Sequence, residues 1–165
     1  EILRDIFNDA WSDNWGFIPF TEAEFTELGN SLRLFLSDDY IRIAEVNGEP
    51  AAFMVVLPNL NEVLAELNGS LFPFGWLKLI KSIRNNEIHT LRIPLMGVRK
   101  KFRNTPLGLA LACLVIDAPR KVAFARGLQG GELSWILENN TAMRAILDKI
   151  GSKQYKRYRI YGKTL

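Results

Sequence analysis

Apolar side chains recur every three or four positions over the first eleven residues, where a helix is expected. The apolar positions are Ile2, Leu3, Ile6, Phe7, Ala10 and Trp11. A second helix is expected to begin after Thr21, because Thr21 and Glu24 have the spacing of a capping box. Its pattern continues to about Leu36.

Three segments have the composition of strands. Residues 40–46 and 50–57 are rich in β-branched and aromatic side chains, and Asn47-Gly48 between them predicts a tight hairpin turn with positive φ at both residues. Residues 89–98 predict a third strand. Pro94 lies within it and has no N–H for the ladder, so we expect a bulge or an edge irregularity there.

The remaining pattern predicts further helices and strands. Between the second and third strands, a short helix near residues 63–67 precedes Asn68-Gly69, and a second helix covers 77–84. A long helix is expected over 107–126, kinked or broken at Pro119. A strand at 132–137, a helix at 141–150 and a final strand at 154–161 follow. This order predicts a mixed α/β (α+β) domain with at least one parallel crossover.

Composition narrows the function classes. The 165 residues suit one domain, and a net charge of +3 is too small to indicate a nucleic-acid partner. No apolar run approaches the roughly 20 residues of a membrane span, and no signal-peptide pattern opens the chain. We therefore expect a cytoplasmic protein that makes no membrane contact. His89 is the single histidine and Cys113 the single cysteine, so we expect no metal site, and we expect Cys113 to be buried and inert.

A basic loop, residues 99–103, precedes the long helix. A helix N-terminus presents unpaired N–H groups and a positive dipole end, so this junction is a candidate anion site. The alternative is a solvated basic turn.

The residues around this junction resemble a known motif. Leu95-Met96-Gly97-Val98, followed by Arg103 and Gly108, is similar to the acyl-CoA motif of the GNAT superfamily of N-acetyltransferases. The segments 133–137 and 139–142 resemble the family's downstream strand and helix start. Residues 8–17 and 133–138 are most similar to the C-terminal half of bacterial proteins that carry two GNAT-like domains in tandem.

The resemblance implies a fold and an organisation. It implies a mixed central sheet of about six strands flanked by helices, with the first strand missing. Residues 1–165 would form a single domain, a fragment of a longer two-domain protein whose upstream domain is a partner.

The resemblance also implies an acetyl-CoA or other acyl-CoA cosubstrate and assigns residues to it. The pantetheine arm would contact Met96, Gly97, Val98 and Asn140. The pyrophosphate would lie against Arg103, Asn104, Thr105, Leu107 and Gly108. Pro106 departs from the motif, since it has no N–H, and one phosphate contact is therefore lost.

The candidate catalytic residues follow the family's pattern less closely than the residues assigned to the cosubstrate. The position at which many family members carry a tyrosine falls at Ile146 or Leu147, and neither can donate a proton. Glu138 is the candidate general base, with a surface or capping carboxylate as the alternative. The nearest phenols are those of Tyr155, Tyr158 and Tyr161, and Tyr158 is taken as the candidate catalytic one. The resemblance implies transfer of an acetyl or other acyl group to a small-molecule or peptide amine. The alternative is a non-catalytic module for domain pairing or acyl-CoA sensing.

Two apolar segments leave alternatives open. The aromatic cluster Trp11, Trp15, Phe17 and Phe20 either lines an acceptor pocket or packs in the core. The insertion at residues 71–80 either packs as a lid on the sheet, covers a long acyl chain, contacts a partner domain or touches a membrane surface.

Overall fold

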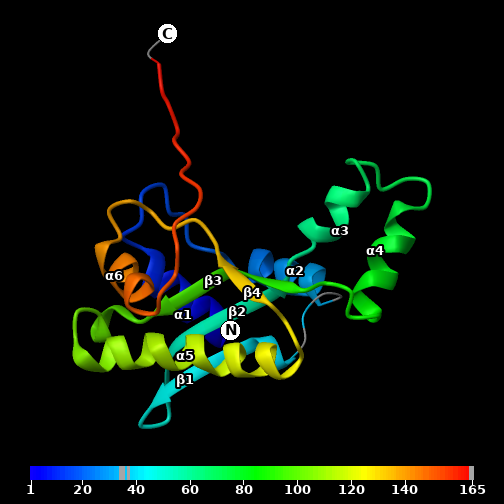
Figure 1. Cartoon of the computed structure of the whole chain (residues 1–165). Coiled ribbons are helices and arrows are strands. Elements are labelled where there is room, and N and C mark those ends of the chain that lie inside the picture. Colours follow the sequence, from blue (N-terminus) through cyan, green and yellow to red (C-terminus); the bar gives the residue numbers. More distant parts are fainter. Residues whose placement is uncertain (34–35, 37, 164–165) are drawn as a thin grey trace. The chain divides into compact units, whose positions relative to one another are not determined.

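The computed structural model describes residues 1–33, 36 and 38–163. The chain divides into two compact units, Glu1–Trp135 and Ile136–Leu165. The first unit contains the sheet and most of the helices (Figure 1).

One mixed sheet forms the centre of the first unit. Its strands β1 (Ile41–Val46), β2 (Glu49–Pro58), β3 (Thr90–Val98) and β4 (Gly130–Leu133) lie side by side in this order. The first three are antiparallel, and β4 runs parallel to β3, which requires the crossover helix α5 (Pro106–Ala125). The predicted mixed α/β fold with a parallel crossover is confirmed. The described residues form four strands in this sheet, and the expected total of six is not confirmed.

Two local predictions about the strands are confirmed. Asn47 and Gly48 have φ values of 52° and 81°, as the predicted turn requires. Val55 pairs with Leu95 and Leu57 with Arg92, so β3 carries one extra residue in the stretch that contains Pro94. The missing N–H of Pro94 thus coincides with a bulge.

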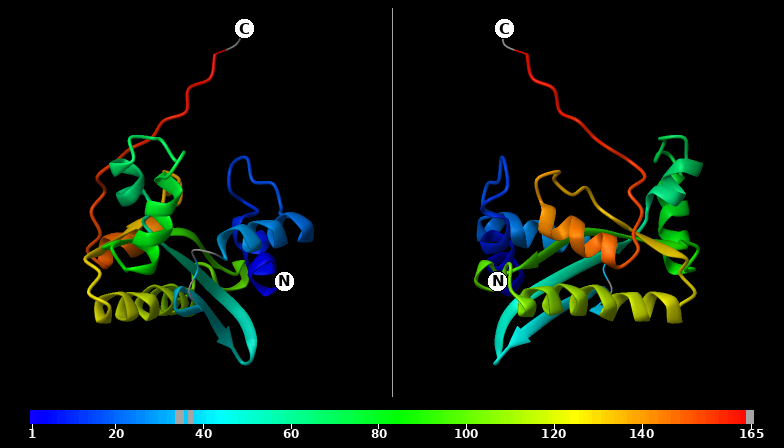
Figure 2. Two further views of the ribbon diagram at one scale, coloured as in Figure 1. Left: turned by 90° about the vertical axis from the view of Figure 1, so that its right-hand side faces the viewer. Right: turned by 60° about the vertical axis from the view of Figure 1, so that its left-hand side comes forward.

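Helices cover both faces of this sheet (Figure 2). On one face, Ile6 and Phe7 of α1 (Ile2–Trp11) pack with Phe53 and Val55 of β2 in a buried cluster. Helix α2 (Glu22–Leu32) lies beside α1. On the other face lies α5, whose buried side includes Leu111, Ala112, Val115 and Ile116.

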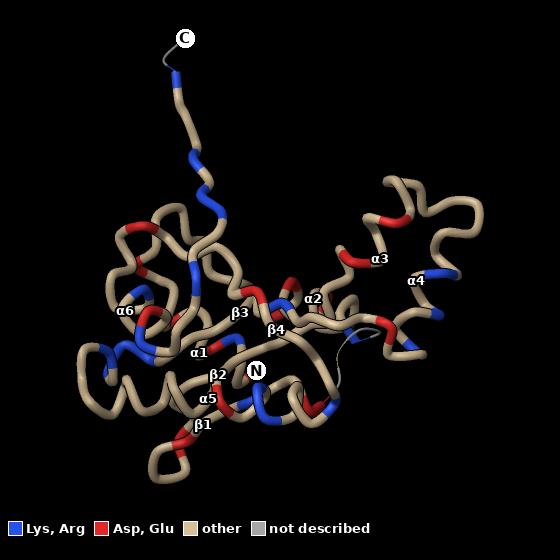
Figure 3. Tube along the Cα trace, viewed as in Figure 1, with Lys and Arg blue, Asp and Glu red and all other residues tan. Residues whose placement is uncertain are grey.

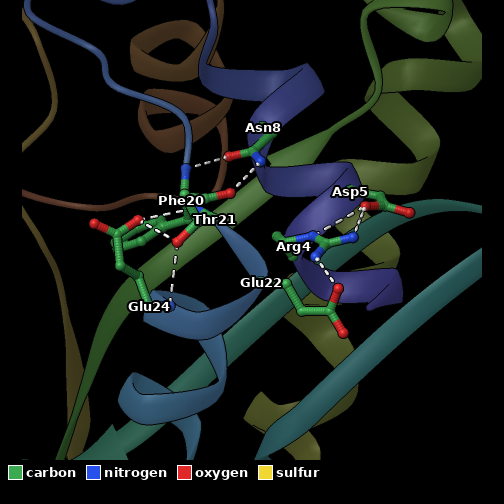
Figure 4. Close-up of polar contacts among 7 residues, drawn as sticks. All are labelled: Arg4, Asp5, Asn8, Phe20, Thr21, Glu22 and Glu24. Atoms are coloured by element: carbon green, nitrogen blue, oxygen red, sulfur yellow. Dashed lines mark hydrogen bonds and ion pairs between the residues drawn. The ribbon is translucent and has the colours of Figure 1, made fainter.

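Side-chain hydrogen bonds fix the joint between α1 and α2 (Figure 4). The amide group of Asn8 both donates to the carbonyl of Phe20 and accepts from its N–H, each at 3.0 Å. The capping box of Thr21 and Glu24 forms as predicted. The predicted extension of this helix towards Leu36 includes residues 34 and 35, which lie outside the described residues.

Two expectations are wrong, and one alternative is excluded. Cys113 is exposed, because it lies outside the buried side of α5, which includes Leu111, Ala112, Val115 and Ile116. The alternative of a break at Pro119 is excluded, because the helix continues to Ala125. Residues 154–161 form no strand; their side chains are exposed, and the second unit contains only α6 (Thr141–Lys149) and no strand to pair with among its described residues.

Candidate functional site

In the described part of the first unit, the outer edge of β3 pairs with a neighbouring strand only before Pro94. Pairing with β4 ends at Ile93, whose carbonyl accepts the N–H of Ser134 at 3.2 Å. Beyond it, the described residues of the first unit place no strand on that side of β3. The N–H of Arg99 bonds to Ala51 on the β2 side, so alternation directs the backbone groups of Met96 and Val98 towards the open edge.

Helix α1 reaches this edge. The indole N–H of Trp11 donates to the carbonyl of Met96 at 2.9 Å, so one of the backbone groups assigned to pantetheine is already bonded. Gly97 permits the close approach: a Cβ there would lie 2.8 Å from the ring of Phe53 and 3.0 Å from the Cβ of Ala10.

The loop after β3 turns directly into α5. Asn104 has a φ of 57°, and the hydroxyl of Thr105 accepts the N–H of Gly108 at 3.0 Å while donating to the carbonyl of Phe102 at 2.7 Å. Thr105 is therefore the N-cap, and Pro106 occupies the first helical position, where its missing N–H costs no helical hydrogen bond. A Cβ on Gly108 would lie 2.0 Å from the carbonyl oxygen of Phe102, so the loop requires glycine there.

Three backbone N–H groups at this junction are open. Within the described part of the chain, the N–H groups of Asn104, Thr105 and Leu107 donate to no protein acceptor. They lie at the positive end of the 20-residue helix α5. Such a group of open donors suits an anion with several oxygens, such as a phosphate.

The cations of the loop already have partners. Asp13 pairs with Lys100 at 2.5 Å and with Arg103 at 3.2 Å, and Glu49 pairs with Lys101 at 2.6 Å. The hydrogen bond from Lys100 lowers the pKa of Asp13, and that from Lys101 lowers the pKa of Glu49. An incoming anion therefore competes with these two carboxylates for the basic side chains.

Sequence reasoning missed the contribution of α1 to this loop. The carboxylate of Asp9 accepts the backbone N–H of Lys100 at 2.8 Å, and Asp13 follows Asp9 by four residues. Asp9 lies in the last turn of α1 and Asp13 lies just after the helix, and their spacing of four residues was the available signal. Their partners lie about 90 residues away, and no local pattern indicates that contact.

The second unit contains the other predicted site residues. The side-chain oxygen of Asn140 accepts the N–H of Met143 at 3.1 Å, so Asn140 caps α6. Glu138 forms a two-point ion pair with Arg159 at 2.5 and 3.2 Å, which lowers the pKa of Glu138. A lowered pKa weakens a general base, so this ion pair does not favour that role. Tyr158 lies in the exposed C-terminal segment, and the roles of all three stay predictions.

The aromatic cluster divides between core and surface. Phe17 and Phe20 lie against the buried ring of Phe7 at centroid distances of 5.7 and 5.4 Å, and Trp11 stacks on it at 4.8 Å. Trp15 is 76% exposed. Three of the four rings therefore pack in or against the core.

The sheet, the crossover and the loop at the start of α5 define a class of fold. The chain is similar to the solved structure of the aminoglycoside N-acetyltransferase AAC(6')-Iy in complex with the bisubstrate analog CoA-S-monomethyl-acetylneamine. The two share 16% identity over 99% of this chain and 90% of that one, with a TM-score of 0.59. The chain thus shares the fold of this acetyltransferase, as the resemblance predicted.

Two curated proteins are closer in sequence. Protein YghO of Escherichia coli (strain K12) is 49% identical over the whole chain, and the bacterial ceramide synthase of Caulobacter vibrioides (strain NA1000 / CB15N) is 44% identical over the whole chain. The chain spans 42% and 43% of their respective lengths. No protein-family model matches the chain.

Proposed function

We propose that this chain is the acyl-CoA-binding part of an N-acyltransferase. The observation that carries the proposal is the group of open N–H donors at Asn104, Thr105 and Leu107. These donors follow β3, whose outer edge beyond Ile93 pairs with no other strand among the described residues of the first unit. The diphosphate of CoA offers oxygens to such donors, and the amides of its pantetheine arm can pair with an open strand edge. A CoA conjugate in the similar acetyltransferase structure supports this.

The contacts narrow the set of residues that would hold the cosubstrate. Gly108 donates to Thr105 and Pro106 has no N–H, so neither would donate to a phosphate. Val98 would contact the pantetheine arm through its backbone. Arg103 would reach a phosphate only after leaving Asp13.

The proposed reaction is a direct transfer. The amine nitrogen attacks the thioester carbonyl, a C–N bond forms, the C–S bond breaks, and one amine proton ends on the thiol of CoA. This reaction requires positioning and a neutral amine rather than a covalent nucleophile. Glu138 and Tyr158 are retained as candidate catalytic residues.

We propose a lipid acceptor. The relative that is 44% identical over this whole chain is called a ceramide synthase, and a ceramide is the amide of a fatty acid and a long-chain amino alcohol. A fatty acyl-CoA donor and a long-chain amino alcohol acceptor are therefore the substrate classes to test. The proposal concerns the activity of a whole protein of this kind, because the relative is more than twice as long as this chain.

The second candidate is a non-catalytic module for domain pairing or acyl-CoA sensing. Pro106 in the loop and the apolar side chains of Ile146 and Leu147 favour it, because each removes a polar group that the acetyltransferase motif supplies.

Release of free thiol distinguishes the two candidates. The chain is mixed with acetyl-CoA or palmitoyl-CoA and a panel of amines that includes sphinganine and an aminoglycoside. The enzyme proposal predicts amine-dependent thiol release, greatest with palmitoyl-CoA and sphinganine. Binding of the thioester without thiol release across the panel would support the module instead.

A pair of variants tests the loop within the same assay. Asp13→Asn removes the carboxylate that competes with phosphate for Lys100 and Arg103, so KM for acyl-CoA should fall roughly threefold at low salt. Asp5→Asn is the matched control, because the carboxylate of Asp5, on α1, pairs with Arg4 instead of with the loop cations. Equal KM values in the two variants would show that the loop cations do not contribute to binding of the cosubstrate.

A further inference from the structure

A helical excursion between β2 and β3 projects beyond the sheet of the first unit (Figures 1 and 2). It contains α3 (Asn61–Glu66) and α4 (Gly75–Arg84), which contact each other. Its base is fixed, because the carboxylate of Glu62 accepts the N–H groups of His89 and Thr90 at 2.9 Å each. Ile88 is buried beside this base. The excursion is thus an ordered part of the unit.

The far end of the excursion is apolar and exposed. We define the α4 surface as the exposed apolar residues of this end and two neighbouring cations: Phe72, Phe74, Trp76, Leu77, Ile80, Lys81 and Arg84. Phe72 and Phe74 are 80% and 72% exposed, and Trp76, Leu77 and Ile80 are each at least 40% exposed. A group of large apolar side chains of this kind usually marks a docking surface.

Local bonds hold the tip in place. The indole N–H of Trp76 donates to the carbonyl of Pro73 at 3.0 Å, and its backbone N–H donates to the carbonyl of Leu71 at 2.9 Å. The hydroxyl of Ser70 donates to the carbonyl of Phe72 at 2.8 Å. These polar groups need no partner outside the chain, so what the tip presents is mainly its apolar rings.

Basic residues border the apolar side of α4, where blue stretches mark the helix in Figure 3. Lys81 follows Leu77 by four residues, and Arg84 follows Ile80 by four, so each cation is next to an apolar side chain on the helix surface. Lys78 pairs with Glu66 at 2.6 Å. Hydrogen bonds from Asn85 and Ser82 and the charge of Lys81 lower the pKa of Glu87, but neither Lys81 nor Arg84 forms an ion pair with any residue that the structure describes.

We infer that the α4 surface docks onto the interface of an anionic lipid bilayer, with α4 lying in the plane of the headgroups. Aromatic and aliphatic side chains bordered by cations are typical of helices that lie in a membrane interface, and unpaired cations beside them complement anionic headgroups. None of the helices in the described part of the chain is long and apolar enough to cross a membrane, so the contact is peripheral. The expectation of no membrane contact rests on the lack of an apolar run long enough for a span, which does not detect a local surface. Contact with a membrane surface is one of the alternatives that the sequence leaves open for residues 71–80. This inference does not depend on the proposed acyl transfer.

Vesicle flotation tests the inference. The chain is floated with vesicles of phosphatidylcholine, with and without phosphatidylglycerol. We expect binding that requires phosphatidylglycerol and falls at high salt. Phe72→Ser with Phe74→Ser should lower the partition coefficient at least tenfold. Lys81→Glu with Arg84→Glu should lower it roughly fivefold or more per charge.

Matched controls lie on α5. Phe124→Ser removes an aromatic ring that is 60% exposed, and Arg120→Glu with Lys121→Glu makes the same change of charge on an exposed helix face. The inference predicts unchanged partition for both. It is overturned if the chain fails to float, or if the controls lose binding as much as the α4 variants.

Two further measurements distinguish a membrane from other occupants of the α4 surface. Brominated lipids should quench the fluorescence of Trp76, and the Trp76→Phe substitution should remove this quenching. The inference is overturned if the chain does not float and sedimentation equilibrium shows a dimer that dissociates when Phe72 and Phe74 are substituted. That result would assign the surface to a second copy of the chain. Thiol release is measured separately with the acceptor in detergent, so failure of the acyl transfer and failure of membrane docking are distinguishable.

Discussion

Gly108→Ala tests the packing of the loop against α5. A Cβ at this position would lie 2.0 Å from the carbonyl oxygen of Phe102, where a carbon–oxygen contact normally needs about 3.3 Å. Phe102 must therefore move by more than 1 Å, roughly the difference between these distances. That movement strains the hydrogen bond that Thr105 donates to the carbonyl of Phe102 and the capping bond that Thr105 accepts from the N–H of Gly108.

The expected cost combines overpacking with a weakened cap. Overpacking contributes about 1–3 kcal/mol and loss of the N-cap about 1 kcal/mol, while replacing glycine by alanine in the helix returns about 1 kcal/mol. We therefore expect the free energy of unfolding to fall by about 1–3 kcal/mol, and Tm by roughly 3–10 °C for a chain of this size.

The assay is thermal unfolding followed by circular dichroism. Gly29→Ala is the matched control, because Gly29 is also helical and a Cβ there meets nothing within 4 Å. Its Tm should rise slightly, since alanine favours the helix by about 0.5–1 kcal/mol. The affinity for CoA should fall with Gly108→Ala and stay unchanged with Gly29→Ala. Equal Tm shifts in the two variants would refute the close packing of loop and helix.

Three further predictions follow from other contacts. Burial disfavours charge on Glu62, but hydrogen bonds from His89 and Thr90 lower its pKa overall, so the stabilisation is present above the pKa of an unfolded glutamate and is lost as the pH falls through the lowered value. Glu62→Gln should therefore lower the free energy of unfolding in urea by about 1–2 kcal/mol at neutral pH, and a difference that does not depend on pH would contradict this. The exposed thiol of Cys113 should react with a disulfide reagent without denaturant, and protection until unfolding would show that it is covered. Trp11→Phe should keep the fold and free the carbonyl of Met96, so native-state hydrogen exchange along β3 should rise; unchanged exchange would show that the indole does not hold this edge.

Much of the fold could be predicted because it depends on local patterns. The capping box at Thr21, the turn at Asn47-Gly48 and the irregularity at Pro94 are all set by residues within a few positions. The failures share a physical cause. Burial of Cys113 and pairing of residues 154–161 depend on which surfaces meet, and the alternation of side chains does not contain that information.

The candidate site shows the same division. The helix N-terminus and its basic loop could be located from the sequence, and so could the loss of one donor at Pro106. The pairing of Lys100 and Arg103 with Asp13 could not, because it joins segments about 90 residues apart. This pairing changes the interpretation of the loop: under the proposed function, the loop would bind an anion through open backbone donors as well as through charge.

Calorimetric titration with CoA, and separately with pantetheine, tests the central claim most directly. Pantetheine has the thiol arm but no diphosphate, so it cannot use the donors at Asn104, Thr105 and Leu107. The account predicts measurable heat with CoA and an affinity at least tenfold lower for pantetheine, since losing charge-assisted hydrogen bonds costs roughly this factor or more. Absence of heat with CoA, or equal affinity for the two ligands, would contradict it.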